Sequence, residues 1–333
     1  ARRHTGPMSA RSGAGRPKLK GKRALVIVNP KAGRRFFLNL YLPPVLRMLD
    51  REQLDYRVVF TRRAGHATRL VGRRRGGLDL IIVFGGDGTV REVVKGLGGQ
   101  PVPVGIVPFG TVNVLALDLG ISFNPVIATA TILSGRLRKI DVGWVNDEPF
   151  LLMVSTGLDA LAVHGVDQRA KRLLGQVAYA AAGLWSALTV HPRRIEVRVK
   201  EGRVRDRGYL AIVSNSRYYA GPHTIAEDIR IDDGLLNVIL FKKSGILETM
   251  RLAVGVLTGR HRTMPDVAFY AGTDIRISGR RRMKMQVDGD KAPPGPAHIR
   301  VKRRFLSVFV PDDSRPRDGL EAVRTVLAHV FAP

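Results

Sequence analysis

Residues 80–92 have the sequence LIIVFGGDGTVRE, an apolar run followed by a glycine-rich turn and the start of a helical pattern. The apolar run Leu78–Phe84 predicts a strand buried on both faces, and Val90–Leu97 predicts a helix. Between them, Gly85, Gly86 and Gly88 allow positive φ and leave backbone N–H groups open, with the positive end of the helix behind them. The stretch therefore predicts a phosphate-binding turn.

The same turn contains Asp87, followed by Gly88 and Thr89. A carboxylate here would repel a bare phosphate, so Asp87 suggests a bridging Mg²⁺, an ion that prefers oxygen ligands. The turn is not a Walker A loop, because no Gly-Lys-Ser/Thr follows, and it does not match the dinucleotide G-x-G-x-x-G pattern. Taken alone, the motif is also compatible with a tight strand-to-helix turn that binds nothing.

Strands and helices alternate on both sides of this turn, from Arg23 onward. The expected strands are Ala24–Val28, Asp55–Phe60 and Val102–Val107, and the expected helices are Phe36–Leu49, one beginning near Gly65-His66-Ala67, one ending at Leu119, and Val126–Ser134. Pro43-Pro44 is a point at which the first helix can split. Strands buried on both faces that alternate with helices predict a doubly wound α/β domain with a parallel sheet, residues 23–141.

After Asp141 the pattern changes to short alternating runs punctuated by Gly, Asp and Pro. This predicts an antiparallel β-rich, sandwich-like second domain, residues 142–311. The runs are Phe150–Ser155, Arg194–Lys200, Tyr209–Ser214, Leu235–Phe241, Asp274–Ser278, Met283–Val287, His298–Val301 and Leu306–Val310. Helices are expected at Gln168–Leu188 and Ile246–Leu257, and a C-terminal helix within 312–333 is expected to pack back on the first domain.

The chain of 333 residues has 55 Lys+Arg against 28 Asp+Glu, a net charge of +27. Eight of the basic residues lie in residues 1–23, and residues 1–22 have the composition of a disordered basic arm. The charge calls for a polyanionic partner: nucleic acid, lipid headgroups or nucleotide phosphates. The absence of Cys excludes disulfides and thiolate sites. The longest weakly polar stretch, Val177–Val190, is shorter than the roughly 18–20 residues of a transmembrane helix.

Nine short motifs follow one another in a recognisable order. They are Asn29-Pro30-Lys31-Ala32-Gly33, Thr61 with Gly65-His66-Ala67, Gly85–Val94, Pro108-Phe109-Gly110-Thr111-Val112-Asn113, Asp141-Val142-Gly143, Ser155–Ala160, Asn215–Pro222, Asp232-Asp233-Gly234-Leu235-Leu236 and Asp288-Gly289-Asp290. In this order they resemble the diacylglycerol kinase catalytic-domain family, which includes bacterial lipid kinases and the sphingosine and ceramide kinases. The resemblance covers about residues 23–311.

The resemblance implies a two-domain kinase with ATP bound in the cleft between the domains. It implies nucleotide contacts at Asn29 and Thr61, phosphate and metal contacts at Gly85, Gly86, Asp87, Gly88 and Thr89, further cleft residues Gly110, Thr111 and Asn113, and a supporting role for Glu92 beside the phosphate turn. Asp288 resembles the family's general base, which accepts the proton of the lipid hydroxyl. A carboxylate in that place meets the requirement of phosphoryl transfer for a base near the attacking alcohol.

The sequence departs from the family pattern at two places. Asp290 stands where the family usually has Glu, which leaves a supporting carboxylate one methylene shorter. Val114 stands where the family usually has Asp, whereas Asp141 still matches a family acid. Asp233 resembles a structural metal site of bacterial members, where its side chain and the backbone carbonyls of Arg230 and Leu235 would hold Mg²⁺. A type I turn is the alternative for that motif.

We therefore expect an ATP- and Mg²⁺-dependent lipid kinase, cytoplasmic and peripherally bound to the inner face of the membrane. Diacylglycerol, giving phosphatidic acid for phospholipid synthesis, is the family's usual substrate; ceramide and sphingoid bases remain open. More distant alternatives are an NAD kinase-like enzyme and a non-enzymatic binder of anionic surfaces. No nucleic-acid-binding pattern is present, so no nucleic acid is expected, and a homodimer is left open.

Three further features bear on substrate access. Helices Gln168–Leu188 and Ile246–Leu257 are candidates for apolar surface near the lipid. The runs Arg73–Arg75, Arg280–Arg282 and Arg303-Arg304 together favour an anionic membrane face. His66 is expected to stabilise the start of a helix rather than to transfer protons.

Overall fold

The computed structural model describes residues 19–32, 35–74, 76–156, 193–219, 223–279 and 283–312. The expected helix Gln168–Leu188, the C-terminal helix and nearly all of the basic arm lie outside these ranges. None of the helices within them is long and apolar enough to cross a bilayer.

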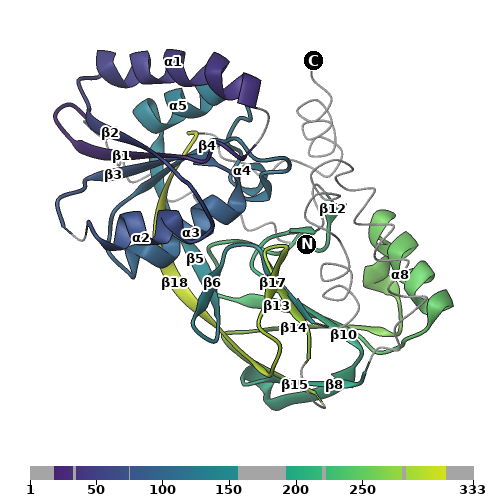
Figure 1. The fold of residues 1–333 in the computed structure, drawn as a ribbon. Coiled ribbons are helices and arrows are strands. Elements are labelled where there is room, and N and C mark those ends of the chain that lie inside the picture. Colours follow the sequence, from purple (N-terminus) through teal and green to yellow (C-terminus); the bar gives the residue numbers. More distant parts are fainter. Residues whose placement is uncertain are drawn as a thin grey trace, which may run out of the picture.

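The first half of the chain folds around a parallel sheet in the order β2-β1-β3-β4. Its elements are β1 (Arg23–Val28), α1 (Arg35–Arg51), β2 (Asp55–Phe60), α2 (His66–Gly72), β3 (Leu80–Gly85), α3 (Asp87–Leu97), β4 (Val104–Pro108), α4 (Val114–Asp118) and α5 (Pro125–Ser134). Helices α1 and α5 pack together on one face of the sheet, and α2 and α3 lie side by side on the other (Figure 1). Because both faces are covered, the residues of β3 are buried throughout.

Helix α1 continues through Pro43-Pro44 without a break, although the sequence allowed one there. Val45 and Leu49, which follow the prolines, are fully buried in the core, and Leu38 before them is nearly so. Burial of this apolar face on both sides of the prolines outweighs the loss of two helical N–H donors.

The second half of the chain forms two layers of β-strands. One layer is the antiparallel sheet β14-β13-β10-β7-β16-β17, and the other continues the first sheet through β18, β15, β8 and β9. The strands are β5 (Arg136–Val145), β6 (Glu148–Phe150), β7 (Met153–Thr156), β8 (Ile195–Val199), β9 (Val204–Gly208), β10 (Leu210–Ser214), β13 (Leu236–Phe241), β14 (Val267–Gly272), β15 (Asp274–Gly279), β16 (Met285–Val287), β17 (Asp290–Ala292) and β18 (Ala297–Val310), with the short pair β11 (Tyr218–Tyr219) and β12 (His223–Thr224). A single-turn helix η1 (Glu201–Arg203), helix α8 (Ile246–Leu257) and η2 (Arg260–Thr263) complete this half.

Val197 and Ile277 of one layer pack with Val213 and Leu240 of the other in a single apolar core. The arrangement is a β-sandwich, and the two-domain fold class predicted from the sequence is confirmed.

Strand β18 connects the two halves. Its C-terminal part pairs in parallel with β4 at Val308 and Val104, while its N-terminal part pairs antiparallel with β15. Strand β5 accompanies it along most of its length, across the boundary expected at residue 141. Figure 1 shows β18 running from the first domain into the second, so one sheet passes through both domains and fixes their geometry.

Candidate active site

The predicted nucleotide-binding residues follow the carboxyl ends of adjacent parallel strands. Asn29 follows β1, Thr61 follows β2 and Phe109-Gly110 follow β4. The first residue after each of these strands forms a backbone hydrogen bond to an adjacent strand. The N–H groups of Asn29, Thr61 and Phe109 donate to the carbonyls of Phe84, Val28 and Gly85 at 2.8, 2.8 and 2.9 Å. In open α/β sheets, ligands bind at this edge.

The glycine-rich motif is less of a loop than the sequence indicates. Gly85 ends β3, Gly86 is the N-cap, and helix α3 begins at Asp87 rather than at the expected Val90. Two glycines have no space for a larger side chain: a Cβ on Gly85 would lie 2.8 Å from the Thr89 side chain, and one on Gly110, in the turn after β4, would lie 2.8 Å from the Cα of Gly86. Gly86 and Gly110 therefore let the two backbone turns touch at the strand ends, and Gly85 leaves room for Thr89.

Asp87 and Asn113 hold these two turns in place. The Asp87 carboxylate accepts hydrogen bonds from the N–H groups of Val114 (2.9 Å) and Leu115 (3.1 Å), which caps helix α4. Asn113, in the left-handed region at φ 52°, closes its own turn through two 2.8 Å bonds with the N–H and carbonyl of Gly110. Val114 thus contributes to the site through its N–H group, which donates to Asp87. This contact does not require an acidic side chain at position 114.

Burial raises the pKa of Asp87 to about 6, and the nearby Asp288 carboxylate adds to the rise, although the backbone bonds to Leu115 and Val114 oppose it. Thr89 is buried beside it, and its hydroxyl accepts a 3.0 Å bond from the Asn29 side-chain amide. Thr111 is exposed at the tip of the second turn. The structure therefore brings the residues predicted around the phosphate turn together.

Glu92 acts at a different place from the one expected. Its two carboxylate oxygens accept bonds from the N–H groups of Gly65 (2.6 Å) and Ala67 (3.0 Å), so it caps helix α2 and not the phosphate turn. His66 Nδ1 accepts a 3.1 Å bond from the N–H of Arg62, so His66 stabilises a helix start as predicted. Both residues position the segment that follows Thr61.

A cavity of about 230 Å³ lies along this segment. It is lined by Arg62, Arg63, His66, Arg69, Leu70 and Arg73. Among the residues that the structure describes, none of its four arginines forms an ion pair with an acid. No motif in the sequence indicates this cavity, whose arginines give the Thr61 side of the site a positive potential that attracts phosphates.

Asp288 occupies the turn between β16 and β17 with positive φ (48°). Its carboxylate accepts bonds from three consecutive N–H groups, those of Leu151 (2.9 Å), Leu152 (2.9 Å) and Met153 (3.0 Å). Burial raises the pKa of Asp288, while the Arg91 guanidinium and these backbone bonds counteract the rise. The carboxylate is thus rigidly held and has a higher proton affinity than a solvated one.

Arg91 joins the two signature motifs across the domain boundary. It stands on α3, one turn after Asp87, and its Nη2 lies 2.7 Å from Oδ2 of Asp290 while Nη1 donates a 2.5 Å bond to the Val287 carbonyl. Gly88 faces the same place, since a Cβ there would lie 3.8 Å from Asp290 Oδ2. The glycine-rich turn and the Asp288-Gly289-Asp290 turn therefore lie next to each other, although about 200 residues separate them in the chain.

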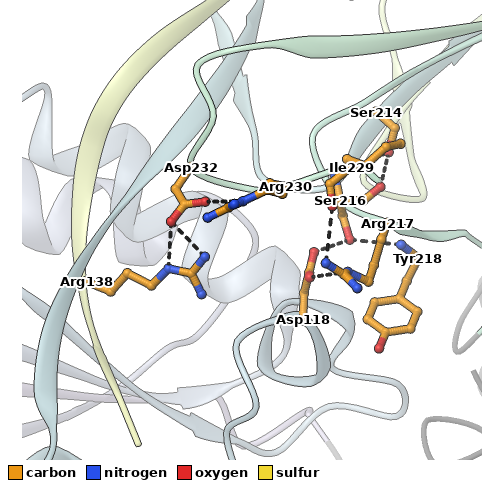
Figure 2. Close-up of polar contacts among 9 residues, drawn as sticks. All are labelled: Asp118, Arg138, Ser214, Ser216, Arg217, Tyr218, Ile229, Arg230 and Asp232. Atoms are coloured by element: carbon orange, nitrogen blue, oxygen red, sulfur yellow. Dashed lines mark hydrogen bonds and ion pairs between the residues drawn. The ribbon is translucent and has the colours of Figure 1, made fainter. Parts of the chain in front are cut away.

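The region around Asp233 is dominated by arginines. Asp233 accepts a bond from the Leu235 N–H (2.9 Å), and burial raises its pKa, with Asp141 and Asp232 adding to the rise. Arg138 binds Asp232 through Nε and Nη2 at 3.0 and 2.8 Å, as Figure 2 shows. Metal binding by Asp233 with the backbone of Arg230 and Leu235 stays a prediction. In the described ranges, no group of three or more acidic, His or Cys side chains gathers in a way that could hold a metal ion.

A buried polar contact that the sequence did not reveal links the domains on this side. The carboxylate of Asp118, at the end of α4, accepts a 2.7 Å bond from the Ser216 hydroxyl, and the Arg217 guanidinium lies 3.5 Å away (Figure 2). Burial raises the pKa of Asp118, and these two partners counteract the rise. The available signal was an acid in the otherwise apolar helix Val114–Asp118.

Two family models match consecutive parts of the chain. The diacylglycerol kinase catalytic domain matches residues 23–145, and the YegS C-terminal NAD kinase beta sandwich-like domain matches residues 152–310. A curated diacylglycerol kinase of Bacillus subtilis is 28% identical over 299 residues, which cover 88% of this chain and 97% of the relative. A diacylglycerol kinase of Staphylococcus aureus (strain Newman) is 28% identical over 297 residues, covering 88% and 93%.

Solved structures of Bacillus anthracis proteins share the fold. One, described as a diacylglycerol kinase, superposes with a TM-score of 0.69 at 23% identity and covers 87% of this chain and 97% of that one. Another superposes with a TM-score of 0.74 at 25% identity, over 92% of this chain and all of the other.

Proposed function

Since the chain belongs to the diacylglycerol kinase catalytic-domain family and is a lipid kinase, we propose that it transfers the γ-phosphoryl group of ATP to the hydroxyl of diacylglycerol, giving phosphatidic acid. The observation that carries the proposal is the meeting of the glycine-rich turn with the Asp288 turn through Arg91. A phosphate-binding turn and a fixed carboxylate on opposite sides of one domain boundary are what transfer to an alcohol requires.

Asp288 is the proposed general base. Its three backbone bonds fix the carboxylate, and its raised pKa brings its proton affinity closer to what base catalysis near neutral pH needs. Asp290 supports it indirectly, since its ion pair with Arg91 anchors the same turn. The backbone N–H groups around Gly85, Gly86 and Gly88, with Thr89, are proposed to hold the phosphates, and Asn29, Thr61 and Asn113 the rest of the nucleotide cleft.

The side chains fit a magnesium ion bound together with the nucleotide. Asp87 and Asp288 are carboxylates close enough for one to raise the pKa of the other, which a cation between phosphates and carboxylates would relieve. Mg²⁺ in kinases is usually held by one or two carboxylates and the substrate phosphates, so a larger acidic cluster is not needed. The ion would neutralise phosphate charge, and we propose Asp87 as its protein ligand.

We further propose that the enzyme works peripherally on an anionic, cytoplasmic membrane face. The net charge of +27 supports this placement, because diacylglycerol does not leave the bilayer and basic residues near anionic lipids are each worth about 1 kcal/mol.

The test is transfer of the γ-phosphoryl group from labelled ATP, with Mg²⁺, to diacylglycerol, ceramide, sphingosine or NAD offered separately. We expect labelled phosphatidic acid, and at least a hundredfold loss of turnover in Asp288→Asn, the order that general-base catalysis supplies. Asp147→Asn, an exposed acid in the β5–β6 turn, is the matched control and should keep full activity. If another acceptor is labelled instead, that acceptor is the substrate and the diacylglycerol proposal is wrong. If the folded Asp288→Asn enzyme is active, Asp288 is not the general base.

A further inference from the structure

Helix α8 (Ile246–Leu257) presents large apolar side chains to solvent. Leu247, Met250 and Val254 are 75%, 51% and 60% exposed. At 3.6 residues per turn these positions fall within about 60° of one another around the helix, so they form a single stripe. We call these three residues the α8 stripe. The other large apolar side chains exposed in the described part of the chain lie singly on separate elements.

The other side of α8 is firmly attached to the domain. Gly255 is buried against Met264, whose side chain occupies the space that a Cβ would need. His261 of η2 is 1% exposed, and its ring nitrogens lie 3.3 Å from the Gly255 carbonyl and 2.6 Å from the Ile225 carbonyl. Helix α8 is therefore anchored by one face, and the stripe is the face that this anchoring leaves outward. Figure 1 shows α8 at the outer edge of the second domain.

The charges around α8 are mainly positive, and Glu248 in its first turn is the one acid of the helix. Lys243 precedes the helix and Arg260 follows it; both are exposed, and neither forms an ion pair with a described acid. Arg251 is half-exposed beside the stripe, 3.9 Å from its nearest acid, Asp266. Lys242 and Arg262 are already paired with acids. An apolar stripe with unpaired cations at both ends is the pattern of a helix that lies in a membrane interface.

We propose that α8 lies on an anionic bilayer, with Leu247, Met250 and Val254 inserted at the boundary between headgroups and acyl chains and with Lys243 and Arg260 among the headgroups. A second copy of the chain fits the stripe less well, because two molecules of charge +27 repel each other. The proposal rests on the proposed function in that a lipid substrate brings the enzyme to a bilayer. Its test measures binding, not turnover.

The experiment compares co-sedimentation of the full chain with phosphatidylcholine vesicles that contain or lack phosphatidylglycerol. Replacing the stripe (Leu247→Gln, Met250→Gln, Val254→Gln) should weaken binding to the anionic vesicles at least tenfold, since burying three apolar side chains even in part contributes that much. The matched control replaces three apolar side chains of similar exposure in the first domain (Leu40→Gln, Ile127→Gln, Leu137→Gln) and should bind like the unchanged protein.

Insertion can be observed directly because the chain has no cysteine. A single Met250→Cys protein labelled with an environment-sensitive dye should shift to the blue when anionic vesicles are added, whereas Ile127→Cys should not. Equal binding of the stripe and control variants, or no shift at Met250, overturns the proposal. So does a dimer in solution that the stripe variant dissociates while vesicle binding stays unchanged. If stripe-dependent binding is found but no lipid is phosphorylated, the surface stands and the proposed reaction falls.

Discussion

Replacing Arg91 by Met removes the contact that joins the two domains at the proposed active site. The side chain of Arg91 is 19% exposed, so its bond to the Val287 carbonyl is a largely buried, charge-assisted one, worth about 1.5–3 kcal/mol. Its ion pair with Asp290, whose side chain is 54% exposed, adds about 0.5 kcal/mol after solvent screening. We therefore expect Arg91→Met to lower the free energy of unfolding by about 2–3.5 kcal/mol.

The same substitution should change the pH dependence of catalysis. Arg91 opposes the rise in the pKa of Asp288, so removing the guanidinium lets that pKa rise further. A general base acts when deprotonated, so the acid limb of kcat/KM moves to higher pH, and activity at a fixed pH on that limb falls. The measurement is kcat/KM for diacylglycerol in mixed micelles at a series of pH values.

Asp290→Asn is the matched control for this prediction. It removes the ion pair but leaves the guanidinium beside Asp288 and its bond to Val287, so it should cost at most about 1 kcal/mol and leave the acid limb in place. If Arg91→Met leaves the acid limb unmoved, or if Asp290→Asn moves it equally, then Arg91 does not tune Asp288 and our reasoning about the paired turns is wrong.

Two further predictions concern the turns around Asp87. The variants Asn113→Gly and Asn113→Ala both lose the two hydrogen bonds to Gly110, but only Gly adopts φ 52° without strain. The Ala variant should therefore be less stable than the Gly variant by about 1 kcal/mol in urea denaturation. Equal stabilities of the two variants would contradict a strained turn at this position. Asp87, with a pKa of about 6 in the folded protein against 3.8 as a free group, makes the folded state bind more protons, so stability falls as pH rises from about 4 to 6, by up to about 3 kcal/mol. Asp87→Asn should flatten this part of the stability profile, and an unchanged slope would assign it to other groups.

The local parts of the fold and site were predictable from the sequence, because they depend on neighbouring residues. The phosphate turn and the strand before it follow from an apolar run and closely spaced glycines. By contrast, β18 is one strand where the sequence indicated two runs, His298–Val301 and Leu306–Val310. The basic residues between them form an irregularity in which the Arg304 N–H donates a 2.6 Å bond to Asp141. That partner lies 163 residues away, so no local pattern could indicate it.

The role of individual site residues was the part that could not be derived. Asp87 was expected to face phosphates and a metal, and the structure adds that its oxygens cap α4, 27 residues later. Glu92 was expected beside the phosphate turn, but it caps α2. A side chain at the end of a strand can accept bonds from any neighbouring turn, and the choice depends on how the turns pack. Sequence order does not contain that information.

The recognisable motifs contain few cations because their side chains fix the positions of backbone turns, whereas the excess Lys and Arg residues supply positive potential. The side chains of Asp87, Glu92 and Asn113 form hydrogen bonds with backbone groups. These bonds fix the positions of turns whose own N–H groups can bind phosphate. Such turns need a defined shape, which requires particular residues, whereas attraction of polyphosphate or anionic lipid needs only positive potential, which many arrangements of Arg and Lys can supply. The shape of the turns at the site therefore depends on short motifs of Gly, Asp and Asn. The charge of +27 is spread over surfaces such as the arginine-lined cavity, where no fixed spacing is required. Short motifs therefore indicate the turns of the site but not the positively charged surfaces around it.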